Sequence, residues 1–276
     1  MGNRIMGNGV SSNSLDIFEE LPDPVSMGPK HYPIRDDAFF CLTEDTMVPQ
    51  GWKIKWREYL LDRNIDTRKP EERQRWNSFA LYGLETEAGD YSRIVGARNS
   101  STKDFSAQLG AGNHVTLCSN LMFYASVVVG RKHTKKIWED LPRLMGKYMG
   151  AIAKSFVSQD ERILQYKETD LTVKDADHLM MEALRGKAIP SSQLKAWEAE
   201  YREPTHEEFE SKTAWSFQNA FTEVGKRWSH HDFQLRTCAL AGVIDSHLGL
   251  TPLAEELKKI VDDPETEDAE VVSLSV

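Results

Sequence analysis

Between Ile137 and Phe156, apolar residues recur every three or four positions, which is the spacing of one face of an α-helix. The members of this face are Ile137, Leu141, Leu144, Met145, Tyr148, Ile152 and Phe156. Pro142 is tolerated in a first turn, so the regular part of the helix is predicted to begin near residues 138 to 140. We expect this long amphipathic helix to pack its apolar face on a sheet.

The segments before this helix have the alternation of a small antiparallel sheet. Apolar, β-branched or alternating runs predict strands at residues 78–86, 91–96, 113–118 and 127–129. Glu87-Ala-Gly-Asp90 has the composition of a hairpin turn between the first two strands. Residues 97–104 are polar and predict a loop. The two glycines within residues 109–113 indicate a turn, because their spacing is not that of a phosphate-binding fingerprint.

The N-terminal part is less regular. Residues 1–33 contain Gly, Asn, Ser and Pro with little periodicity, and they predict a flexible arm. Residues 36–47 indicate a short helix. Residues 52–64 carry large apolar residues at helical spacing among basic ones, which indicates either the buried stripe of a charged helix or aromatic rings that stack on bases. The large residues are Trp56, Tyr59 and Leu60, and the basic ones are Lys53, Lys55, Arg57 and Arg63.

Helical patterns dominate the chain after Phe156. Thr172 and Asp175 have the spacing of a capping box at a helix start, and Thr251-Pro252 predicts another start. The chain is therefore predicted to be an α+β protein, in which a small antiparallel sheet is packed by a long amphipathic helix and followed by a helical C-terminal half. Its predicted parts are a flexible arm (1–33), an α+β core with a basic surface (34–156), a helical part (157–261) and an acidic disordered tail (262–276).

Charge separates these parts. From Arg93 to Lys154 there are 10 Lys/Arg and 3 Asp/Glu, a balance of +7, whereas the whole chain has a net charge of −9, so the remainder sums to −16. Residues 155–276 hold 13 basic and 24 acidic residues, a balance of −11. A local basic excess inside an acidic protein is typical of a phosphate-binding surface, and it also fits an ordinary solvated helix face.

Other features of the composition narrow the setting. The three cysteines, Cys41, Cys118 and Cys238, lie far apart, which favours neither a disulfide framework nor a cysteine-based zinc site. No apolar run approaches the length of a membrane helix, and the first residues lack a signal-peptide core. We therefore expect a soluble protein of the cytoplasm that does not bind membranes.

The candidate binding residues lie within the basic stretch. The polar loop of residues 97–104 could bind phosphate oxygens or could equally be an exposed connection, and the segment before the long helix and the outer face of the helix hold the other cations. The predicted nucleic-acid-binding residues are Arg98, Asn99, Lys103, Arg131, Lys132, His133, Lys135, Lys136, Arg143 and Lys147. Lys154 shares the solvated face with the last two. No catalytic residue, metal ligand or cofactor is assigned.

A metal-dependent hydrolase is a weaker alternative. His231 and Asp232 form a pair that occurs in metal sites, but nothing in the spacing of other His or Asp residues selects further ligands. Nucleophile-elbow, zinc-protease and Walker motifs do not occur in the sequence. The fragment is more typical of a turn that links two helices.

Several segments in order resemble a phage- and plasmid-borne family of unknown function. The resemblance covers residues 93 to 240. It is carried by Val95-Gly-Ala-Arg-Asn-Ser-Ser-Thr-Lys-Asp-Phe105, Val115-Thr-Leu-Cys-Ser-Asn-Leu-Met122, Gly130-Arg-Lys-His-Thr134, Asp140-Leu-Pro142, Arg202-Glu-Pro204 and Thr213-Ala-Trp-Ser-Phe-Gln-Asn-Ala-Phe-Thr-Glu-Val224. It implies a mobile-element or viral setting and no particular reaction. The predicted order of strands and helix is also similar to the core of phage single-strand annealing proteins, which is an analogy of fold alone.

These observations favour a nucleic-acid-binding accessory protein of a phage or plasmid that acts on single-stranded DNA in annealing or recombination. A homo-oligomer would be needed to form a continuous groove from so few cations per subunit. The alternative is a non-enzymatic protein that binds a host or phage partner through its acidic helical half.

Overall fold

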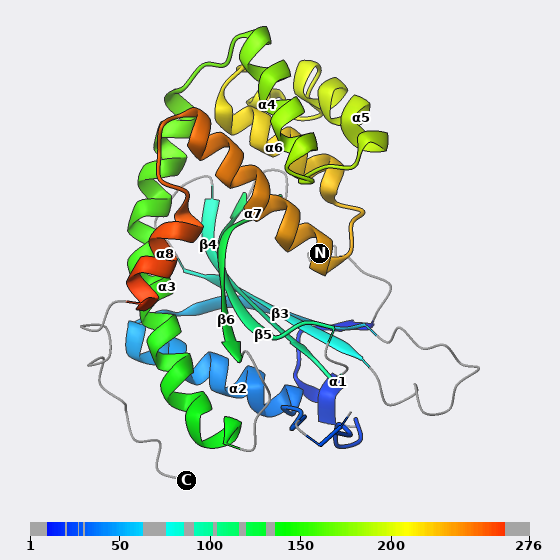
Figure 1. Cartoon of the computed structure of the whole chain (residues 1–276), viewed down its shortest axis with the longest axis vertical. Helices are drawn as coiled ribbons and strands as arrows, with labels where there is room; N and C mark the ends of the chain where they lie inside the picture. The colour runs from blue at the N-terminus through cyan, green and yellow to red at the C-terminus, as the bar shows by residue number, and fades with distance from the viewer. Residues whose placement is uncertain are drawn as a thin grey trace.

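The structure is a computed structural model that describes residues 10–19, 21–26, 28–29, 31–62, 76–85, 91–101, 104–115, 120–130 and 136–262. Within these ranges, six strands form one antiparallel sheet in the order β1-β2-β3-β4-β5-β6, and helices lie around it (Figure 1). The strands are β1 (Val10–Ser12), β2 (Ile54–Asp62), β3 (Asn77–Leu84), β4 (Tyr91–Ser100), β5 (Ala107–Val115) and β6 (Leu121–Gly130). The predicted α+β class, with a helical C-terminal half, is confirmed.

The sheet has more strands than predicted, in part because residues within the range 52–64, whose spacing indicated a helix, form the strand β2. Lys55 and Arg57 are exposed while Trp56 and Glu58 are more buried, which is the two-residue period of a strand. In the second half of the strand this alternation is lost, because Glu58 to Leu61 are all buried. The large residues Trp56, Tyr59 and Leu60 therefore also fit the spacing of a helix face. β1 and β3 pair with the two edges of β2, and the run of buried residues from Glu58 to Leu61 shows that both faces are covered at this end of the strand.

Two segments predicted as a loop and a turn belong to central strands. β4 continues through Arg98 to Ser100, and β5 includes the glycines predicted to form a turn. Gly112 has no room for a side chain, because a Cβ there would lie 2.1 Å from the Met122 carbonyl oxygen. Gly96 receives the ring of Phe123, which would lie 2.6 Å from an added Cβ. These glycines therefore allow close contacts within the sheet and do not form a turn.

Part of the predicted flexible arm is built into the fold. β1 pairs with β2, and Phe18 of the short helix α1 (Asp16–Glu19) is 2% exposed. The Phe18 ring lies 5.2 Å from that of Phe40, which belongs to α2 (Asp36–Met47). These aromatic contacts hold this part of the predicted flexible arm in the fold, and a sequence of low periodicity does not reveal them. After α2, the short helix η1 (Val48–Gln50) leads into β2.

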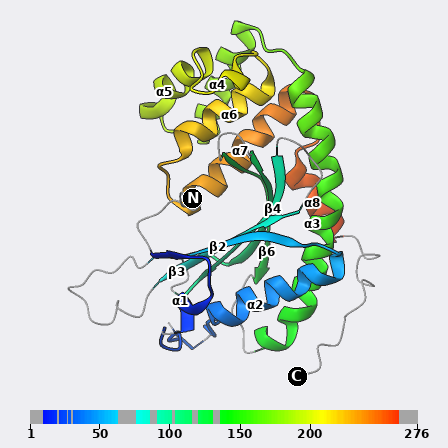
Figure 2. The same ribbon diagram turned by 180° about the vertical axis from the view of Figure 1, so that it is seen from behind.

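The long helix α3 (Ile137–Glu168) runs along one flank of the molecule and crosses the predicted boundary at residue 156 (Figures 1 and 2). It begins at Ile137, slightly before the predicted start, and Pro142 lies inside it. Its buried face contacts β5 and β6 and also meets helices from both halves of the chain. The predicted amphipathic packing on a sheet is therefore confirmed, and the helix is longer than the pattern indicated.

The remaining helices gather at one end of α3 and along β6. They are α4 (Val173–Arg185), α5 (Ser191–Arg202), η3 (Glu207–Phe209), α6 (Ala214–Gly225), α7 (His230–His247) and α8 (Leu253–Asp262). The predicted capping box is present at α4, because the Thr172 hydroxyl accepts from the Asp175 N–H at 3.2 Å and the Asp175 carboxylate accepts from the Thr172 N–H at 3.1 Å.

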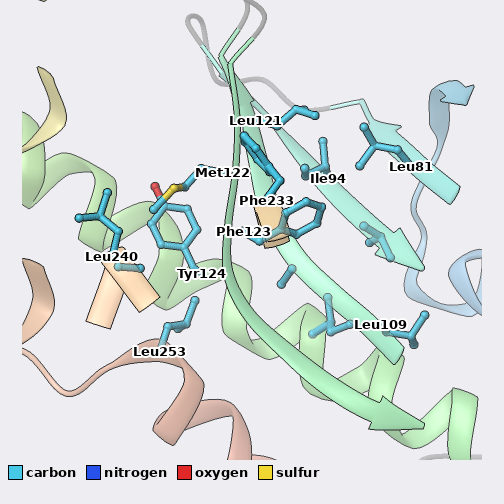
Figure 3. Close-up of a cluster of buried hydrophobic side chains, with 14 of the residues drawn as sticks. Leu81, Ile94, Leu109, Leu121, Met122, Phe123, Tyr124, Phe233, Leu240 and Leu253 are labelled. Atoms are coloured by element: carbon cyan, nitrogen blue, oxygen red, sulfur yellow. The ribbon is translucent and has the colours of Figure 1, made fainter. Parts of the chain in front are cut away.

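The edge strand β6 is the contact between the sheet and the C-terminal helices. Phe123 and Phe233 lie together on one side of β6, and Met122, Tyr124 and Leu240 gather on its other side (Figure 3). The Phe123 N–H donates to the Thr237 hydroxyl of α7 at 3.3 Å. α7 therefore covers an edge that would otherwise present free backbone groups.

Candidate functional site

Arg98 and Asn99, predicted to contact phosphates from a loop, are interior residues of β4. Their exposed fractions are 3% and 0%. The Arg98 guanidinium donates to the Gln108 side-chain oxygen at 2.6 and 3.0 Å and lies 4.6 Å from the centre of the Phe105 ring. Burial lowers the pKa of Arg98 to about 10. These polar side chains are therefore held inside the protein and are not presented to a surface ligand.

Asn99 forms part of a buried network around Asp36, at the start of α2. Its side-chain N–H groups donate to the Asp36 carboxylate at 2.8 Å and to the Ile34 carbonyl at 3.0 Å. The same carboxylate accepts from the Trp76 indole at 2.5 Å and from the Ser78 hydroxyl. Burial raises the pKa of Asp36, and the three hydrogen bonds oppose that rise. The network fastens α2 to β3 and β4, which gives the Asn of the Arg-Asn-Ser motif a structural role.

Five of the predicted binding residues lie outside the described residues: Lys103, Arg131, Lys132, His133 and Lys135. The positions of the described strand ends nevertheless show where the connections that contain these residues leave the sheet. Ala107 pairs with Gly130, and Ser100 pairs with Asn77. The β4–β5 and β6–α3 connections therefore leave the sheet from the same end, which the sequence alone did not show.

The other predicted cations lie on α3. Lys136 immediately precedes the helix and is exposed, as is Arg143, and Lys147 is half-buried. With exposed Lys154 they follow the outward face of the helix, opposite the residues packed on the sheet. At ~1.5 Å per residue, this row is about 27 Å long from Lys136 to Lys154. The predicted solvated basic face of the helix is confirmed.

Within the described ranges, none of these four cations forms an ion pair. Arginines elsewhere do: Arg93 pairs with Asp160 of α3, and Arg57 pairs with Glu44 at 2.9 Å. These four side chains also take no part in other hydrogen bonds, ring contacts or electrostatic interactions of the described residues. Their charged groups are therefore in no direct ion pair with a described residue, although exposed Glu139 and Asp140 lie in the same turn as Lys136 and next to Arg143, and these charged groups can contact an external anion.

Trp138 is an exposed aromatic side chain that the sequence reading did not select. It lies in the first turn of α3 and is 43% exposed. In helical spacing Trp138 comes three and seven residues before Leu141 and Met145, so it lies on the packed side of α3 and away from the cation row. The available signal was its position next to the basic segment in the sequence. An exposed indole provides a surface on which a nucleic-acid base can stack.

Two other motif segments meet inside the protein. The Asn120 side chain donates to the Asn219 backbone carbonyl at 3.2 Å, which joins the start of β6 to α6. Next to this contact in sequence, the Gln218 side chain donates to the Tyr124 hydroxyl at 2.9 Å, and Asn113 donates to the same hydroxyl at 3.2 Å. Burial raises the pKa of Tyr124 above its ordinary value. These polar residues join the sheet to the helical half, so their roles are structural.

The metal alternative gains no support from the described residues. Asp232 lies in the first turn of α7, where its carboxylate accepts from the Ser229 hydroxyl at 2.9 Å and its N–H donates to that hydroxyl at 3.2 Å. Across the described ranges, no group of three or more His, Cys, Asp or Glu side chains is arranged to hold a metal ion. Asp232 therefore acts as part of a helix cap.

A small hollow of about 80 Å³ lies in the helical half, near the start of α4. Apolar side chains line it together with the ring of Tyr201, whose hydroxyl is buried and has no hydrogen-bond partner. Arg202 at its rim already pairs with Asp177 and Glu198. The charges at this rim are therefore largely compensated, in contrast to those on α3.

Comparison with known proteins identifies no relative. The chain matches no protein-family model, no curated protein and no solved structure. The resemblance to a phage- and plasmid-borne family stays a prediction from its motifs. In the part of the chain that the structure describes, no helix combines the length and apolar character needed to cross a bilayer.

Proposed function

We propose that this protein binds single-stranded DNA along the outward face of α3 and at the adjoining end of the sheet. The observation that carries the proposal is the row of four cations on α3 that have no ion-pair partner among the described residues. Four cations in one row fit a backbone of regularly spaced phosphates, and binding releases the condensed counterions of the strand.

Two further features support a single strand over a duplex. Trp138, at the start of α3 and on the side away from the cation row, offers an exposed ring to unstacked bases, which a duplex does not present. The row follows the outward face of α3 on one flank of the molecule, where an extended strand can reach it (Figure 2). Several copies bound side by side would extend the track, so a homo-oligomer on nucleic acid belongs to the proposal. Its setting would be the cytoplasm during replication or recombination of a phage or plasmid.

The test is fluorescence anisotropy of a labelled single-stranded DNA at several salt concentrations, with duplex DNA and single-stranded RNA as competitors. The variant Arg143→Glu with Lys147→Glu should bind at least ~100-fold more weakly than the wild-type protein. If each cation neutralises one phosphate, the slope of log K against log salt should fall by about 0.7 for each lost contact.

A matched control makes the same change of net charge on the acidic half. Lys174→Glu with Lys195→Glu replaces two exposed lysines on α4 and α5. This control should bind as the wild-type protein does. Binding that does not depend on salt, or an equal loss in both variants, would contradict the proposed site.

A further inference from the structure

Two large apolar side chains are exposed on the outward face of α3, where the described chain does not cover them. Val157 is 60% exposed and Leu164 is 56% exposed, although the opposite face of the same helix is fully packed. About two to five turns earlier on this face lie Gly150 and Gly146, and a Cβ added to either would meet no atom within 4 Å. The face therefore has two projections in its second half and a shallow hollow in its first half.

The charges on this face are divided in the same way. Between residues 143 and 168, the part that the partner helix would face, exposed or half-buried Arg143, Lys147 and Lys154 come first and exposed Glu161 and Glu168 follow, while exposed Glu139 and Asp140 lie before this part. The acidic residue next to this row, Asp160, is already paired with Arg93 of the sheet. One face of a single helix thus has a basic half and an acidic half. Such a face is complementary to a copy of itself that runs in the opposite direction.

We propose that a second copy of this chain packs on the outward face of α3, with the two α3 helices antiparallel about a two-fold axis between residues 155 and 156. This register places each outward residue opposite another outward residue. The facing pairs are Arg143 with Glu168, Gly146 with Gln165, Lys147 with Leu164, Gly150 with Glu161, and Lys154 with Val157.

The register explains the projections and the hollow together. Leu164 of one copy lies over the Gly146–Gly150 hollow of the other, where the absence of side chains allows close approach of the helices. Glu161 lies over Gly150, between Lys147 and Lys154 of the partner copy. Because the axis is two-fold, each of these contacts occurs twice.

The pairing rests on the pattern of α3 itself, and only its consequence for regulation rests on the proposed function. The acidic half of one copy would cover the basic half of the other, so a second copy and a nucleic-acid strand would exclude each other. The antiparallel pair is then the form without nucleic acid, and binding of a strand separates it.

The experiment is sedimentation velocity of the full chain over a range of concentrations, at low and high salt. The wild-type protein should form a dimer that weakens as salt rises. Arg143→Glu and Glu168→Arg should each weaken dimerisation about tenfold or more, because each places like charges opposite each other twice. The double variant with both changes should restore the dimer, since it reverses both members of the pair.

Each possible result supports the pairing or contradicts it. A wild-type monomer at all concentrations overturns the proposal, and so does a dimer that neither single change weakens. A double variant that remains monomeric overturns the register. All the changed side chains are exposed, so circular dichroism should show unchanged folding. DNA binding of the same variants separates the two proposals: Glu168→Arg should retain binding, and Arg143→Glu should lose it with or without Glu168→Arg.

Discussion

The inner and outer faces of α3 use arginine and lysine in opposite ways. On the inner face, Arg162 is 4% exposed and its Nε lies 2.8 Å from the Asp245 carboxylate of α7. The same guanidinium donates to the Thr251 carbonyl at 2.5 Å and reaches Glu256 of α8 at 3.1 Å. On the outer face, three turns or more away, Lys147 and Arg143 have no ion-pair partner among the described residues.

This difference shows that residue type does not reveal the role of a cation in this chain. Arg98 and Arg162 are buried, and their guanidinium N–H groups donate to acceptors within the protein itself. The outward cations of α3 contribute little to the fold and remain available to a partner. Burial and pairing, which the structure supplies, therefore decide which basic residues belong to a binding site.

The largest effect should come from removing the acid at the inner face. Asp245→Ala leaves the buried Arg162 guanidinium without its closest counter-ion and deprives the Tyr166 hydroxyl of its acceptor at 2.5 Å. We expect the free energy of unfolding to fall by about 3 to 5 kcal/mol, measured by urea denaturation. Glu182→Ala, which breaks the exposed pair with Arg185, should change it by less than about 0.5 kcal/mol. Equal losses in the two variants would contradict the contrast.

A smaller loss is expected for Asn99→Ala, which removes one of three donors to the buried Asp36 carboxylate. We expect about 1 to 3 kcal/mol from the lost hydrogen bonds. Asn77→Ala removes a more exposed bond to Asp104 and should cost less. After correction for the folded fraction, Asn99→Ala should retain the affinity for single-stranded DNA. A selective loss of binding would return Asn99 to the functional site.

The same variant has an expected pH dependence. Folding raises the pKa of Asp36, so this carboxyl costs no stability below its unfolded pKa and reduces stability as pH rises through its folded pKa. The Asn99 bond favours the ionised form, so its contribution is present above the folded pKa and disappears as pH falls. The difference in unfolding free energy between the wild type and Asn99→Ala should therefore be larger at neutral pH than under mildly acidic conditions.

The smallest effect has the opposite sign and belongs to the outer face. Gly150→Ala should stabilise the monomer by about 0.5 to 1 kcal/mol, because the new methyl group meets no atom and the unfolded chain loses freedom. Gly225→Ala is the matched control in another helix, where a Cβ would lie 2.9 Å from the Trp228 ring and should destabilise. Unfolding is measured at a protein concentration below that of dimerisation. A loss of stability in Gly150→Ala would show that the outer face is packed within the chain.

Periodicity predicted much of the fold because it reports directly on which face of an element is buried. The apolar row of α3 and the Thr172 capping box both occur in the structure as local patterns indicated. The helix prediction for the residues of β2 was wrong because a strand that is buried on both faces loses its polar–apolar alternation, and its apolar residues can then fit helical spacing. The turn prediction for the glycines of β5 was wrong because the close approach at Gly112 comes from β6, a different segment of the chain.

The candidate site could be predicted only in part for the same reason. The outward position of Arg143 and Lys147 follows from helical spacing, which is local. The burial of Arg98 and Asn99 depends on pairing with β3 and β5 and on Asp36, which lies 63 residues from Asn99 in the sequence. Polar sequence predicts exposure unless a distant segment supplies hydrogen-bond partners, and here such segments do.

The hydrogen bond between Phe123 and Thr237 also has a consequence for the order of synthesis. The sheet pairs strands that follow one another in sequence, so it can form as each strand leaves the ribosome. The helix that covers β6 is made later, because the two bonded residues are separated by 114 positions. At ~5–20 residues per second, the open edge of a nascent sheet would wait roughly 6 to 23 seconds for its cover. During that interval the growing chain depends on β6 finding no other strand.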